Sequence, residues 1–231
     1  MAKNESIFPF RGTLGKMVFT RGKYGDDVRA KRGTYKPVTI NETLKANANR
    51  SAMLNGLASP LYQLLCMHST YYRDGGAWAR MLSALRKAKS DNRYDLLQQL
   101  KGMDMHEKYL MSRVWPYIPS PQIQVGSKQQ LNVGMQACSA PSFSKKLRTN
   151  VYRYHLTAYF LPESENQWQY DTAYTEWMPY ISYENAYDFC FDKPYGNGVF
   201  LLVMKLEAGN ERGALGVMES LRIGVFDVGE Y

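Results

Sequence analysis

The stretch from residue 152 to residue 160, YRYHLTAYF, alternates between two kinds of side chain. One parity is apolar or aromatic and consists of Tyr152, Tyr154, Leu156, Ala158 and Phe160. Because successive side chains of a strand point to opposite faces of a sheet, this period of two predicts a strand with one buried face. The same alternation at 130–137 and 187–191 predicts two further strands of the same kind.

The chain after residue 116 carries this period of two almost throughout, and short turns separate its segments. Further strands are predicted at 199–207 and at 215–228, the latter with a bulge because the apolar parity switches at Phe226. Three prolines between Trp115 and Pro121 indicate a stiff connector and a boundary. We therefore expect residues 116–231 to form an antiparallel β domain, a sandwich or a barrel of six or seven strands.

The residues from 39 to 115 have helical spacing instead. Thr39 begins a capping-box pattern, and Pro60 in the Ser-Pro pair at 59–60 is expected to end one helix and to start a second over 60–72. An apolar stripe predicts a helix at 77–89. Asp91 is expected to cap another helix that ends at Gly102, and a last helix is predicted within 103–114.

The N-terminal 38 residues are predicted to be a basic arm followed by a hairpin. Residues 1–11 have no regular period, 14–20 form a strand, 21–26 are turn material and 27–31 return. The expected domains are thus 1–38, 39–115 and 116–231, and the fold class is α+β.

Charge is unevenly distributed along the 231 residues, whose net charge is +8. The first 150 residues hold 24 basic and 9 acidic side chains, whereas the last 81 hold 5 and 12. A basic end and an acidic end favour head-to-tail contact between copies, which builds rings or filaments. The alternatives are that the two halves dock within one chain or that the charges are solvated.

Basic side chains gather around the first hairpin and on the helix predicted at 77–89, which carries no acid. We expect them to contact a partner protein or nucleic acid, and the candidates are Arg11, Lys16, Arg21, Lys23, Arg29, Lys31, Arg32, Arg80, Arg86 and Lys87. No signature of a sequence-specific nucleic-acid-binding fold accompanies them, so nucleic-acid binding, the alternative function, would be non-specific and salt-dependent.

Catalytic and cofactor motifs are absent from the sequence. There is no phosphate-binding loop, no dinucleotide fingerprint and no Gly-x-Ser-x-Gly elbow, and the three Cys and three His lack the spacing of a metal site. The acidic pair Glu207 and Glu211 is expected to be solvated loop charge, and a nucleophilic pair of His155 with Cys190 rests on residue types only. We therefore predict no enzyme activity, no cofactor and no metal. Trp168 and Trp177, with nearby Tyr residues as a stacking platform, leave an enzyme or a carbohydrate-binding module in the β domain as a third class.

The N-terminal sequence FRGTLGKMVF at 10–19 is followed by GDDVRAK at 25–31 and by a stretch rich in Asn, Arg and Ala at 41–55. This pattern resembles the N-termini of uncharacterised bacterial and phage-borne proteins, which open with a Gly-x-x-Gly strand and a Val-Arg return. The resemblance covers about 50 of the 231 residues and brings no catalytic residues. It implies a component of a particle.

These observations predict a non-enzymatic structural protein, most concretely a head, neck or tail subunit of a phage-like particle. Its expected partners are further copies of itself, in a ring or polymer, and other particle proteins. No apolar run is long enough for a membrane span, and the N-terminus lacks the apolar core of a secretory signal. We expect the protein in the cytoplasm of the producing cell and in the particle.

Overall fold

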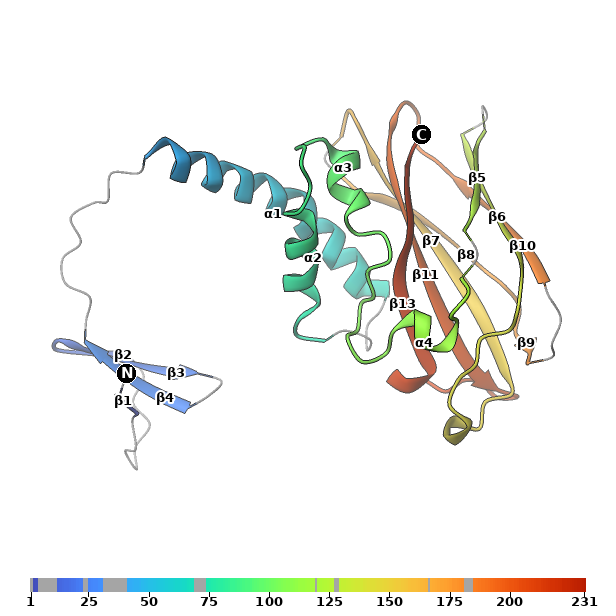
Figure 1. The fold of residues 1–231 in the computed structure, drawn as a ribbon, viewed down its shortest axis with the longest axis horizontal. Coiled ribbons are helices and arrows are strands. Elements are labelled where there is room, and N and C mark those ends of the chain that lie inside the picture. Colours follow the sequence, from blue (N-terminus) through green and yellow to red (C-terminus); the bar gives the residue numbers. More distant parts are fainter. Residues whose placement is uncertain are drawn as a thin grey trace. The chain divides into compact units, whose positions relative to one another are not determined.

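The computed structural model of the chain divides into two compact units, residues 1–48 and 49–231 (Figure 1). The structure describes residues 2–3, 12–22, 25–30, 41–68, 74–118, 120–126, 129–165, 167–180 and 185–231. The predicted arm at 1–11 lies almost entirely outside these residues, as does the predicted cap Thr39. The fold class is α+β, as the sequence predicts, with a sheet-rich C-terminal region.

The first unit contains a four-stranded antiparallel sheet in the order β1-β4-β3-β2. Its strands are β1 (Ala2–Lys3), β2 (Gly12–Leu14), β3 (Met17–Gly22) and β4 (Gly25–Ala30). The single strand predicted over 14–20 is wrong, because the chain reverses at Gly15 and Leu14 then pairs with Met17. Gly15 has a φ of +57°, a left-handed conformation that glycine adopts without a steric penalty.

Helix α1 (Glu42–His68) is continuous through Pro60, so the predicted break there is wrong. A proline inside a helix removes one hydrogen bond and costs about 3 kcal/mol. The stripe of buried residues stays in phase across it, and this stripe consists of Leu54, Ala58, Leu61 and Leu65. Burial of that stripe offsets the cost. The helix is capped by Asn41, whose side chain accepts a hydrogen bond from the Leu44 amide at 2.8 Å.

The other helices are shorter than predicted: α2 (Ala77–Leu85), α3 (Arg93–Gln98) and α4 (Met111–Val114). Asn92, not Asp91, caps α3, because its side chain accepts a hydrogen bond from the Tyr94 amide. Most of the helix predicted within 103–114 is absent. Its first residues instead lie alongside the last strand of the chain, residues 221–230. The Met105 amide donates a hydrogen bond to the Ile223 carbonyl of that strand. None of the described helices is long and apolar enough to cross a membrane.

The C-terminal strands form two antiparallel sheets that do not close into a barrel. The larger sheet has the order β12-β11-β7-β8, with β13 also paired to β11 and β9 to β7; the smaller has the order β10-β6-β5. The strands of the larger sheet are β7 (Val151–Pro162), β8 (Gln169–Tyr174), β9 (Met178–Pro179), β11 (Gly198–Asn210), β12 (Gly213–Ala214) and β13 (Leu221–Glu230). Those of the smaller sheet are β5 (Gln122–Val125), β6 (Gln130–Cys138) and β10 (Asn185–Asp192).

The bulge predicted at Phe226 is confirmed. Leu202 pairs with Asp227 and the next residue, Val203, pairs with Val225, which leaves Phe226 as the extra residue on β13. The predicted strand over 215–228 is too long at its start. A helical turn at Met218–Ser220 precedes β13, whose first residue is Leu221.

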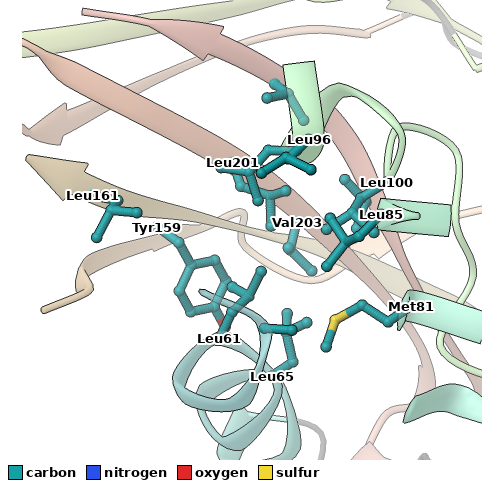
Figure 2. Packing of buried hydrophobic residues seen from close by; sticks show 14 of the residues in the cluster. Leu61, Leu65, Met81, Leu85, Leu96, Leu100, Tyr159, Leu161, Leu201 and Val203 are labelled. Atoms are coloured by element: carbon teal, nitrogen blue, oxygen red, sulfur yellow. The ribbon is translucent and has the colours of Figure 1, made fainter. Parts of the chain in front are cut away.

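The larger sheet lies between two other layers, with the helices on one face and the smaller sheet on the other (Figure 1). Tyr154, Leu156 and Phe160 of β7 pack toward the smaller sheet. Tyr159 and Leu161 of the same strand pack toward the helices, with Leu61 of α1 close by (Figure 2). The expectation of one buried face is therefore wrong for β7, because helices cover its second face along much of its length.

Candidate functional site

Nine of the ten predicted basic contact residues fall into three groups. Lys16 is exposed in the turn between β2 and β3, and Arg86 and Lys87 are exposed just after α2. Arg21 lies within β3 and Arg29 within β4. Four of the candidates lie outside the described residues, namely Arg11, Lys23, Lys31 and Arg32.

Arg80 differs from the other described candidates because it is half-buried and its guanidinium is bonded to other parts of the fold. Its Nη1 is 3.0 Å from an Asp74 carboxylate oxygen, and its Nη2 donates to the carbonyl oxygens of Asp104 and Met105. Burial tends to raise the pKa of Asp74, but hydrogen bonds from the Glu107 amide and from Arg80 lower it overall. Through these hydrogen bonds, Arg80 links the first turn of α2 to the segment that follows α3.

The N-terminal sheet presents apolar side chains to the outside. Among the residues from 12 to 48 whose burial the structure describes, none is buried. Leu14 is 73% exposed and its ladder partner Met17 is 54% exposed. These two side chains leave apolar surface on the sheet open to solvent.

A groove lies where β8 and β10 meet, and we call it the acidic groove because Glu176 and Asp188 line it and Asp171 and Asp192 lie beside it. The two strands are end strands of their respective sheets, and the Asp192 amide donates to the Asp171 carboxylate at 3.0 Å. Beside this contact the groove has a volume of about 380 Å³ and is lined by residues of both strands, including Asp188 of β10, and by Glu176, which follows β8. Tyr174, at its edge, is 64% exposed. The groove therefore offers carboxylates and an aromatic ring beside two strand edges.

A second polar site lies on the helix-facing side of the larger sheet, around Glu207. This carboxylate is 5% exposed, so the expectation that Glu207 is solvated loop charge is wrong, whereas Glu211 is exposed as expected. Its Oε2 accepts hydrogen bonds from Arg153 Nε and His155 Nε2 at 2.8 Å each, and its Oε1 pairs with the Lys205 ammonium.

The three donors fix the protonation state of Glu207. Burial tends to raise the pKa of this carboxyl group, but the hydrogen bonds from His155 and Lys205, the charge of Lys205 and the hydrogen bond from Arg153 outweigh it. The pKa of Glu207 lies far below its ordinary value, so the group is ionised at neutral pH.

A pocket of about 140 Å³ adjoins this cluster, beneath the C-terminal end of α1. His68 closes one side, and its Nδ1 shares a hydrogen bond of 2.5 Å with the Tyr159 hydroxyl. Burial and then the charge of Lys205 lower the pKa of His68, while burial raises that of Tyr159. We call this pocket the polar pocket; its lining residues are Leu65, His68, His155, Thr157, Tyr159, Thr172, Val203, Lys205 and Ile223.

The structure does not bring the other sequence candidates together. Cys190 is exposed on β10 of the smaller sheet, whereas His155 is bonded to Glu207 on the helix-facing side of the larger sheet. Trp168 packs against the core beneath the helices. Trp177 stacks with Arg153, whose Cζ atom lies 4.5 Å from the centroid of the Trp177 ring. Within the described part of the chain, no three His, Cys, Asp or Glu residues are grouped to hold a metal ion.

The sequence contained one signal for the polar pocket. Arg153 and His155 share one parity of β7, and Lys205 and Glu207 share one parity of β11, but the pairing of these two strands is set only in the fold. No model of a protein family matches the chain, and a search of curated proteins found no significant match.

Proposed function

We propose that the protein is a non-enzymatic assembly subunit, in which the basic N-terminal unit of one copy docks onto the acidic groove of the next copy. The observation that carries this proposal is the exposure of the N-terminal sheet. Among the residues of this sheet whose burial the structure describes, none is buried. The exposed pair of Leu14 and Met17 gains free energy from a covering partner, because each buried Å² of apolar surface contributes about 25 cal/mol.

Charge complementarity favours a second copy as that partner. Residues 1–50 have 11 basic and 4 acidic side chains, and the last 81 residues have 5 basic and 12 acidic ones. Opposite potentials speed and orient docking. Contact between different surfaces of identical chains is heterologous, so it generates rings or open polymers.

A particle subunit is the most concrete form of this function. The resemblance of residues 10–31 to the N-termini of phage-borne proteins supports that setting, and other particle proteins are then further partners. The site of action would be the cytoplasm of the producing cell and the particle itself.

The test is a charge exchange followed by light scattering across protein concentration and salt. We expect the wild-type protein to form oligomers that dissociate at high salt. Glu176→Lys with Asp188→Lys, and separately Lys16→Glu with Arg21→Glu, should each reduce the oligomer mass. An equimolar mixture of the two variants should restore association, because each supplies the surface that the other lacks.

The matched control is Glu163→Lys with Glu211→Lys, which makes the same charge change at two exposed acids outside the groove. The control should assemble as the wild type does. A wild-type monomer at every concentration, or equal effects of the groove variant and the control, would overturn the proposal.

Non-specific nucleic-acid binding is the second candidate, favoured by the exposed run of Arg86, Lys87 and Lys89 at the end of α2. Duplex DNA titrated at several salt concentrations measures it directly. Nucleic-acid binding predicts an affinity that falls steeply with salt and that weakens in Arg86→Gln with Lys87→Gln. An affinity without salt dependence removes this candidate.

A further inference from the structure

The polar pocket adjoins a cluster of charged side chains in which cations outnumber carboxylates, and Lys205 and His155 of this cluster line the pocket itself. Arg153 and Lys205 are the basic side chains of this cluster, and among the described residues Glu207 supplies the one carboxylate that pairs with them. His155 adds a third donor to the same carboxylate. Both oxygens of this carboxylate are engaged by the three donors, which disfavours a cation at this place.

Donors and hydroxyl groups face the remaining space. Lys205 has three N–H donors, and among the described residues the Glu207 carboxylate is the one ion-pair partner of its ammonium. Thr157 and Thr172, whose hydroxyls are 3.0 Å apart, line the pocket together with the Tyr159 hydroxyl and His68. Leu65, Val203 and Ile223 supply the apolar part of the wall.

The size of the pocket limits what it can accept. A water molecule occupies about 30 Å³ in the liquid, so a pocket of about 140 Å³ has room for four or five waters, or for one small polyatomic ion. Tyr170 is 47% exposed and packs edge-to-face on His68, which places the pocket close to solvent.

We propose that the polar pocket binds a small oxyanion, a phosphate group or a carboxylate, through Lys205 with the hydroxyls of Thr157 and Thr172. Charge-assisted hydrogen bonds to such an ion are about twice as strong as neutral ones. The ion also offsets the positive charge that Lys205 exerts on His68. The ligand is a free ion or the anionic end of a larger molecule whose remainder extends past Tyr170.

The experiment titrates the full chain with inorganic phosphate, sulfate and acetate at constant ionic strength, with chloride as the reference ion. Calorimetry measures binding, and the NMR signals of the His68 imidazole report where it occurs. Saturable binding of phosphate or acetate, with a shift of the His68 signals, is expected. Tighter binding of phosphate and sulfate indicates a tetrahedral ligand, and tighter binding of acetate a carboxylate.

Lys205→Gln should weaken that binding about tenfold or more, since it removes a charge-assisted hydrogen bond. Lys145→Gln, at an exposed lysine outside the pocket lining, is the matched control and should bind as the wild type does. Because Lys205 also supports Glu207, Thr172→Val serves as a second variant that leaves the Glu207 ion pairs in place and should weaken binding as well. Absence of saturable binding, or binding unchanged in both Lys205→Gln and Thr172→Val, would overturn the proposal.

Discussion

The Nε2 atom of His155 lies 2.8 Å from Oε2 of Glu207, although the two residues are not direct partners in the β7–β11 ladder. The register pairs His155 with Lys205 and Glu207 with Arg153. Glu207 therefore receives donors from its direct partner, its diagonal neighbour and a residue two positions earlier on its own strand. Side chains at these positions share one face of a sheet and lie within reach of one another.

Replacing the buried carboxylate tests how much this cluster stabilises the fold. Glu207→Gln leaves three donors facing a neutral amide, and loss of one partner from a buried ionic cluster costs about 3 kcal/mol or more. Urea unfolding at neutral pH should show this loss. Glu211→Gln, at the exposed residue of the same sequence pair, should change the free energy of unfolding by about 0.5 kcal/mol or less. Equal effects of the two substitutions would contradict the buried assignment.

The stability contributed by Glu207 should depend on pH in a defined direction. Its pKa is depressed in the folded protein, so its contribution is present above the ordinary carboxyl pKa of 4.5 and is lost as pH falls toward the folded value. The difference in unfolding free energy between wild type and Glu207→Gln should therefore be present at neutral pH and shrink below pH 4.5. A difference that grows on acidification would contradict the ionised cluster.

Pro60 should be a site where substitution raises stability. Pro60→Ala restores a backbone donor inside α1, and the gain exceeds the entropy that the proline removes from the unfolded chain. We expect the free energy of unfolding to rise by about 1–2 kcal/mol. Thermal unfolding measures the change, with Ser59→Ala as the neighbouring control. A lower melting temperature in Pro60→Ala would mean that the packing of α1 depends on the proline.

The packing of α1 against the larger sheet should depend on the buried stripe of this helix. Leu61 is fully buried beside Tyr159, as Figure 2 shows, and Leu61→Ala should cost about 2–5 kcal/mol through lost burial and a cavity. Leu44→Ala makes the same chemical change at a half-exposed position of the same helix and should cost far less. Denaturant unfolding of the two variants compares them. Similar losses would show that α1 does not depend on this contact.

The sequence predicted the strands of the C-terminal half well, because a period of two is a property of neighbouring residues. The alternation at 130–137, 152–160 and 187–191 corresponds to β6, β7 and β10. The parity switch at Phe226 corresponds to a bulge on β13 for the same reason. Each of these signals is local and survives folding unchanged.

The sequence was less informative where contacts between distant residues outweigh local preference. Pro60 predicts a break, but Leu61 and Leu65 continue the buried stripe of α1 beyond it. Residues 103–105 contain no strand pattern, yet their backbone pairs with β13 because that strand offers free donors and acceptors beside them. The spacing of residues along the sequence predicts neither the core against which α1 packs nor the strand with which residues 103–105 pair.

By itself, the sequence determined the α+β class, the polarity of charge and the order of helical and strand regions, since composition and periodicity are written along the chain. Only the tertiary structure decided which polar residues meet. Glu207 is 54 residues from Arg153, and their ion pair exists because β7 and β11 align in one particular register. Register depends on the packing of both faces of the sheet, a property of the whole core rather than of any one segment.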